Sequence, residues 1–97
     1  MSNQKEIYNK IATAIIQKQA EIIGSKIAIK KAEKVPQLVL DDQGEVFNLG
    51  LDPIVTLGNL VKEYMQLSGS VAINFSKEAI SNILLNNPGI ELPTELQ

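Results

Sequence analysis

The first third of the chain repeats apolar residues at helical spacing. Asn3 and Glu6 have the spacing of an N-cap residue and its capping-box partner, so a helix is predicted to begin there. The apolar positions that follow cover about half of the helix circumference, which is wider than the usual apolar stripe. They are Ile7, Tyr8, Ile11, Ala12, Ile15, Ile16, Ile22 and Ile23. A chain of 97 residues has few other elements with which to cover so wide a face.

A break in this helical pattern is predicted at Gly24 and Ser25, after which the apolar face has rotated. The rotation indicates either a kink or a second helix that Ser25 caps. The exposed side of this second segment is basic, with lysines at positions 26, 30 and 34. Pro36 ends it, because the residue before a proline avoids helical backbone angles.

The middle of the chain predicts a hairpin and then a helix. Two short apolar stretches, 37–40 and 45–49, flank the turn residues 41–44, which is typical of a β-hairpin. Asp52 and Pro53 have the pattern of an N-cap followed by a proline at the first helical position. The amphipathic helix that they begin is predicted to run to about residue 67.

The segment 71–75 fits two different structures. Apolar residues alternate with smaller or polar ones there, which indicates a strand before a last helix that Ser76 would cap. The alternative is one continuous helix from Ser70 to Asn86. We favour the strand, because β-branched residues cluster in this segment.

These elements predict an α+β fold. Its order is an N-terminal helix or helix pair, a β-hairpin, an amphipathic helix, a possible third strand and a C-terminal helix, and the fallback is a helical bundle with a hairpin. We expect one globular domain over residues 1–89, since a chain of this length has area for one modest core. Residues 90–97 follow the last predicted helix and include a proline, and we expect them to form a flexible C-terminal tail.

Side-chain chemistry argues against catalysis and metal binding. The chain has no Cys and no His, so it lacks the thiol nucleophile, the commonest general base and the commonest metal ligand. Asp41, Asp42 and Glu45 lie in the predicted hairpin turn, but their spacing does not match a calcium-binding loop. We therefore expect no enzymatic activity, no cofactor, and no catalytic, cofactor-binding or metal-binding residues.

The distribution of charge is uneven along the chain. Residues 1–35 carry seven of the nine basic residues, all of them lysines, and residues 36–97 carry eight of the eleven acidic residues. The two halves can attract each other within one fold or between subunits. We find neither the apolar core of a signal peptide nor a stretch of about 18 apolar residues that would span a membrane, and we expect a cytoplasmic protein.

Self-association through the first helix is the leading functional hypothesis. An apolar stripe that its own domain cannot cover leaves an exposed patch, and symmetric dimers are the commonest way to cover one. We interpret the chain as a non-enzymatic regulatory or scaffolding module that binds protein, as a homodimer. The predicted interaction residues are Ile7, Ile11, Ile15, Ile22, Lys26, Lys30 and Lys34.

Two alternatives remain open. One is a weak binder of nucleic acid or of another anionic surface through the lysine-bearing helix face. The lack of arginine, the usual reader of guanine, disfavours DNA as the partner. The other alternative is a small enzyme of unknown type. Salt dependence separates the first alternative from an apolar protein interface, because phosphate binding weakens steeply as salt is added.

Overall fold

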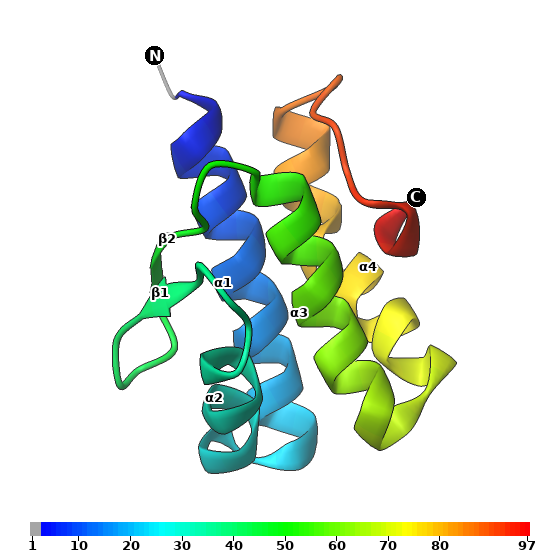
Figure 1. Ribbon diagram of the computed structural model, residues 1–97. Helices are drawn as coiled ribbons and strands as arrows, with labels where there is room; N and C mark the ends of the chain where they lie inside the picture. The colour runs from blue at the N-terminus through cyan, green and yellow to red at the C-terminus, as the bar shows by residue number, and fades with distance from the viewer. Residues whose placement is uncertain (1–2) are drawn as a thin grey trace.

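The structure is a computed structural model that describes residues 3–97. Within these residues the chain forms four α-helices, one two-stranded antiparallel sheet and a short 3-10 helix (Figure 1). The helices are α1 (Gln4–Ile23), α2 (Ser25–Glu33), α3 (Pro53–Ser68) and α4 (Ser70–Asn86); the strands are β1 (Val39–Leu40) and β2 (Val46–Asn48); the 3-10 helix is η1 (Thr94–Leu96). The fold is therefore α+β in a form dominated by helices.

The predicted starts of two helices are confirmed. Asn3 Oδ1 accepts a hydrogen bond of 2.8 Å from the Glu6 amide, which satisfies one of the free N–H groups at the start of α1. Asp52 Oδ1 accepts a hydrogen bond of 3.3 Å from the Val55 amide in the same way. Pro53 occupies the first turn of α3, where its missing N–H costs nothing.

The breaks between consecutive helices fall at glycines with positive φ. Gly24, with a φ of 90°, separates α1 from α2 and confirms the predicted break. The expected cap by Ser25 is wrong, because Gly24 occupies the cap position and Ser25 is already helical. Gly69, with a φ of 59°, separates α3 from α4.

The possible third strand at 71–75 is wrong, since α4 is continuous from Ser70 to Asn86. Its buried residues recur every four positions, at Ala72, Ser76 and Ile80, and each of the three is fully buried. This is the period of a helix face rather than of a strand. The most extensive contact of α4 is with α1, and α4 also contacts α3.

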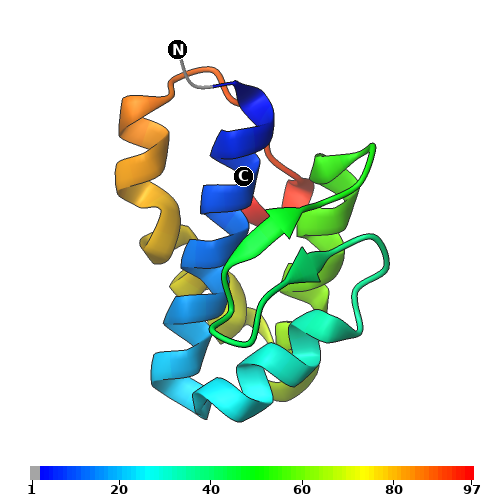
Figure 2. The same cartoon turned by 90° about the vertical axis from the view of Figure 1, so that its left-hand side faces the viewer.

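Helix α1 is the central element of the fold. It contacts α2, α3, α4 and β2. Figure 1 shows the hairpin on one side of α1 and helices α3 and α4 on the other, and in Figure 2 α4 again lies across α1 from the hairpin. One cluster of buried side chains fills the space between these elements. Different parts of the wide apolar face of α1 pack against different neighbours. Much of that face is therefore buried within a single chain.

The hairpin predicted between residues 37 and 49 is confirmed, although its strands are shorter than expected. Polar side chains of α1, spaced one helical turn apart, bind its backbone. Asn9 Nδ2 donates to the Phe47 carbonyl (3.0 Å), the Val46 amide donates to Thr13 Oγ1 (2.9 Å), and Gln17 Nε2 donates to the Gln43 carbonyl (2.8 Å). We call these three side chains the polar ladder of α1. Its hydrogen bonds hold the hairpin against three successive turns of α1.

Residues 90–97, the predicted flexible tail, pack against the helices. Leu96 in η1 is buried, and η1 contacts both α3 and α4. The Tyr8 hydroxyl donates a hydrogen bond of 2.9 Å to the Glu91 carbonyl. Lys62 Nζ lies 3.6 Å from Glu95 Oε2. Composition pointed to a loose segment, but an apolar side chain and a few polar contacts are enough to dock it.

Candidate interaction surfaces

The predicted interaction residues do not form one surface. Ile11 and Ile15 have no exposed area, and Ile7 is half-buried against the core. The other four, Ile22, Lys26, Lys30 and Lys34, are exposed. Elements of the same chain cover the middle of the apolar stripe, so a surface for self-association must be built from other residues.

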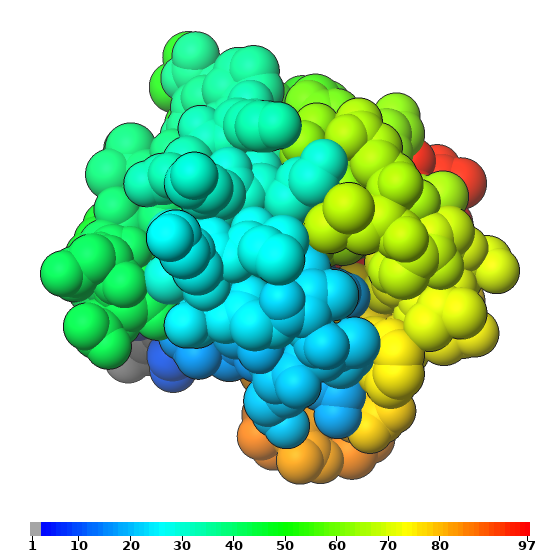
Figure 3. Space-filling model, turned by 90° about the horizontal axis from the view of Figure 1, so that it is seen from below, coloured from blue at the N-terminus to red at the C-terminus, as the bar shows by residue number. Residues whose placement is uncertain are grey.

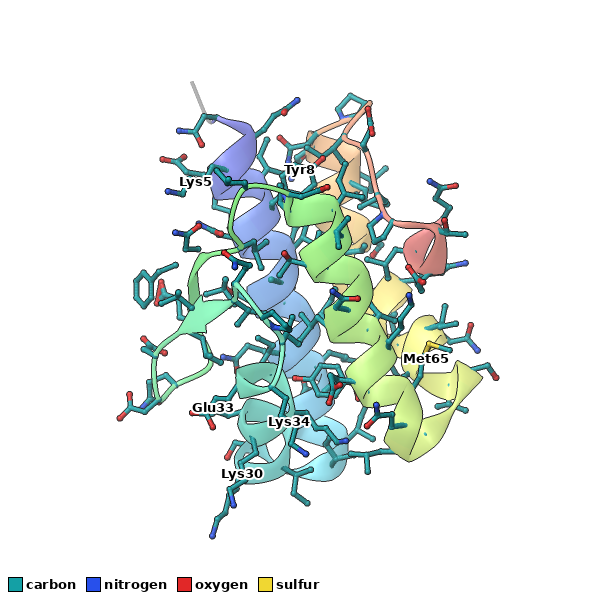
Figure 4. All side chains as sticks on the ribbon, in the orientation of Figure 1. Lys5, Tyr8, Lys30, Glu33, Lys34 and Met65 are labelled. Carbon is teal, nitrogen blue, oxygen red and sulfur yellow. The ribbon has the colours of Figure 1, made fainter. Side chains whose placement is uncertain are left out.

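A hollow of about 560 Å³ lies between the first two turns of α1 and the loop that leads into α3. Its walls include Lys5 and Tyr8 from α1, which Figure 4 labels at this end of the molecule. Leu49 and Pro53 add apolar lining from the loop side. A volume of this size falls in the range of ordinary binding pockets.

Leu51 stands at the rim of this hollow with its side chain fully exposed to solvent. A second hollow, of about 360 Å³, lies on another side of Leu51 and includes the half-exposed Val55. A single exposed leucine is ordinary on a protein surface. Leu51 is unusual because it is completely exposed and has a hollow on either side. We call Leu51, Val55 and the two hollows the Leu51 surface.

The loop that carries Leu51 is held by hydrogen bonds on both sides. Asn48 Oδ1 accepts a bond of 3.0 Å from the Gly50 amide, which closes a turn before Leu51. The Thr56 hydroxyl, after Leu51, donates a bond of 2.7 Å to the Leu49 carbonyl. The fold therefore presents this leucine to solvent in a defined position.

Only a glycine fits at position 50 of this loop. Gly50 has a φ of 80°, which side-chain-bearing residues rarely adopt. A Cβ atom there would lie 2.7 Å from the Cβ atom of Gln37. Gln37 itself has a φ of 73°, an uncommon value for a residue other than glycine. The close approach of these two residues shapes one wall of the larger hollow.

The Leu51 surface carries charges of both signs. Lys5 lines the larger hollow and Asp52 lines the smaller one. Among residues 3–97, neither has an oppositely charged partner within 4.0 Å. Burial, with the nearby carboxylate of Glu91 as a second cause, raises the pKa of the Tyr8 hydroxyl. Tyr8 therefore remains a neutral hydrogen-bond donor next to the hollow.

Sequence reasoning missed Leu51, although a signal for it exists. Leu51 directly precedes the cap residue of α3, where an apolar side chain usually packs on the fourth helical residue. That residue is Thr56, whose hydroxyl binds backbone carbonyls of the preceding loop. When the fourth helical residue is polar, the apolar residue before the cap has no apolar side chain there to pack on.

In residues 3–97 no three Cys, His, Asp or Glu side chains gather closely enough to hold a metal ion. No helix in that range combines the length and apolarity that crossing a bilayer requires. The fold and surfaces define a small helical protein with an attached hairpin. No protein-family model, curated protein or solved structure matches the chain.

Proposed function

We propose that this protein is a non-enzymatic protein-interaction module, of a regulatory or scaffolding kind, that forms a homodimer through the Leu51 surface. The observation that carries the proposal is a fully exposed leucine on a fixed loop beside a hollow of about 560 Å³. Residues that dominate binding usually insert into well-packed pockets near the centre of an interface. A prepositioned apolar side chain also loses little conformational freedom on binding.

A second copy of the chain suits this surface because Leu51 lies next to the hollow that could receive a leucine from another copy. In a twofold dimer the same patch meets itself. A symmetry axis close to Leu51 would bring the leucine of each copy to the hollow of the other. The same arrangement would bring Asp52, the residue after Leu51, towards Lys5 of the opposite copy. Opposite charges at the rim favour this register over others.

Such a dimer needs an interface of ordinary size around Leu51. Stable interfaces bury about 800 Å² on each partner. That is about one seventh of the 5657 Å² accessible surface of this chain. Val55 and Phe47, each about half exposed, extend the apolar area on the two sides of the loop.

Sedimentation velocity at increasing protein concentration tests this proposal. The informative variant is Leu51→Ser, and the matched control is Leu85→Ser, since Leu85 is another exposed leucine but lies on α4 outside the Leu51 surface. We expect wild type and the control to sediment as dimers at high micromolar concentration and Leu51→Ser to remain a monomer. A monomeric wild type, or a dimer that survives Leu51→Ser, would contradict the proposal.

A charge-swap experiment tests the register of the dimer. Lys5→Glu would place like charges at the rim opposite Asp52 and should weaken the dimer. The matched control is Lys10→Glu, which changes the net charge equally at an exposed position outside the lining of either hollow of the Leu51 surface. Equal weakening by both variants would show a general charge effect, and the proposed register would then be wrong.

A further inference from the structure

The end of the molecule opposite Leu51 carries a second exposed apolar area. It lies where α1 turns into α2 and where α3 turns into α4, and these two turns are side by side in the view from below (Figure 3). Four aliphatic side chains there are between 42% and 51% exposed, namely Ile22, Ile27, Leu67 and Val71. We call these four side chains the turn surface.

Contacts one helical turn away join the two helices that carry Ile27 and Leu67. Lys31 Nζ of α2 lies 2.8 Å from Gln66 Oε1 and 3.7 Å from Glu63 Oε1 of α3. The two helices run in opposite directions (Figure 1). Ile27 lies one turn before Lys31 and Leu67 one turn after Glu63, so both extend towards the same end of the molecule. The turn surface thus bridges the two helix pairs.

Lysines of α2 lie beside one part of the turn surface. Residues 18–34 hold five lysines and two glutamates, a net charge of +3, whereas the whole chain has −2, so the remaining residues carry −5. Residues 64–76, which include the turn between α3 and α4, hold no charged residue, but Glu63 and Glu78, just outside this range, pair with two of the five lysines, Lys31 at 3.7 Å and Lys18 at 3.2 Å. Lys26 and Lys30 have no carboxylate within 4.0 Å among residues 3–97. Figure 4 shows Lys30 directed away from the helices at this end.

These observations argue against a second copy of the chain as the occupant. A twofold contact through the turn surface would bring two ends of the same positive sign together, which is unfavourable. The two hollows of the Leu51 surface, and a third of about 500 Å³ between α1 and the hairpin, are all lined by residues outside the turn surface. None of these hollows could therefore receive a side chain that protrudes from a partner docked on the turn surface. The surface suits a negatively charged partner that the exposed aliphatic side chains can also contact.

We infer that the turn surface docks on an anionic lipid bilayer, with its four aliphatic side chains entering the interfacial region and the lysines of α2 meeting lipid phosphates. Apolar side chains bordered by lysines are the usual means by which proteins bind such a surface without spanning it. Each lysine near an anionic leaflet adds to the attraction, and the uneven charge of the molecule orients it before contact. Nucleic acid explains the lysines but leaves the four aliphatic side chains without a role.

This inference does not depend on the proposed dimer. The Leu51 surface lies at the far end of the bundle and would face away from the bilayer (Figure 1). A monomer could therefore bind lipid, and a dimer could form in solution. Failure of one proposal leaves the other standing, because the two involve different residues and different measurements.

Flotation with lipid vesicles tests the inference on the 97-residue chain. Vesicles of phosphatidylcholine alone are compared with vesicles that also contain phosphatidylserine, at low and at high salt. We expect wild type to float with the anionic vesicles at low salt, to bind neutral vesicles much less, and to lose binding as salt screens the lysines. Absence of flotation with anionic vesicles, or equal binding to neutral ones, would overturn the inference.

Two double variants separate the charged and apolar contributions. Lys26→Glu/Lys30→Glu should weaken vesicle binding by roughly tenfold or more, and Lys10→Glu/Lys77→Glu, with the same change in net charge, should have much less effect. Ile27→Ser/Leu67→Ser should also weaken binding while leaving the circular dichroism spectrum unchanged, since both residues are half exposed. Full binding by this last variant, together with equal or tighter binding of wild type to a DNA duplex, would assign the surface to nucleic acid and overturn the lipid proposal.

Discussion

Helix α1 meets its neighbours in two chemically different ways. Towards the core it contributes aliphatic side chains such as Ile11 and Ile15, which are completely buried. Towards the hairpin it contributes the polar ladder, whose members hydrogen-bond the hairpin backbone. Apolar burial supplies most of the free energy of folding but has little directionality. Hydrogen bonds add less net stability but depend on geometry. The first contact therefore holds the fold together, and the second determines where the hairpin sits.

The largest expected effect is on the apolar side of α1. Ile15→Ala removes methyl and methylene groups from a site with no exposed area, and such truncations cost about 2–5 kcal/mol of unfolding free energy. Ile22→Ala is the matched control on the same helix, because Ile22 is 42% exposed. Denaturant unfolding measures both changes. A loss of less than about 1 kcal/mol for Ile15→Ala would mean that α1 is not central to the core.

A smaller effect is expected on the polar side of α1. Thr13→Val keeps the side-chain shape but leaves the Val46 amide without its acceptor, which costs about 1–3 kcal/mol when the group stays buried. The exposed Thr94 provides the control variant Thr94→Val, for which we expect almost no change. If the Thr13 and Thr94 variants unfold at the same denaturant concentration, the ladder contributes nothing measurable.

Tyr64 offers an intermediate case, a polar contact inside the apolar core. Its hydroxyl donates a hydrogen bond of 2.7 Å to the Ala28 carbonyl, and the whole side chain is buried. Tyr64→Phe removes this bond, so we expect a loss of about 1 kcal/mol at neutral pH. Burial also raises the pKa of the Tyr64 hydroxyl well above its usual value of 10.0.

The raised Tyr64 pKa makes the stability of the protein depend on alkaline pH. The folded state holds the proton more tightly than the unfolded state, so this contribution is complete below pH 10.0 and is lost as pH rises above that value. Tyr8 shifts in the same direction. Denaturant unfolding across alkaline pH should show a decline that is shallower in Tyr64→Phe. Parallel declines in wild type and variant would contradict the assignment to Tyr64.

The sequence predicted the features that depend on neighbouring residues. The caps Asn3 and Asp52, the break at Gly24 and the hairpin turn all follow from local backbone chemistry, and the structure bears them out. The segment 71–75 was harder because its β-branched residues favour a strand locally. Its helical form depends on close packing of the small residues Ala72 and Ser76, which involves another part of the chain.

The candidate surfaces depended even more on distant parts of the chain. The width of the apolar stripe on α1 was recognised from the sequence, but its burial required knowing that α2, α3, α4 and the hairpin surround one helix. Because the sequence alone does not show this arrangement, Ile11 and Ile15 were expected at a dimer interface. In the structure both are fully buried. Leu51 and the turn surface emerge only when separate segments are placed together in space.

The most direct test of the account is amide hydrogen exchange at Val46, resolved by residue. In the structure this amide donates a hydrogen bond to Thr13 Oγ1 of the polar ladder. We expect the Val46 amide to be protected in wild type and to exchange much faster in Thr13→Val, while the amide of Leu60 in the core keeps its protection. A Val46 amide that already exchanges in wild type as fast as an exposed amide would show that α1 does not hold the hairpin, and the account would be wrong.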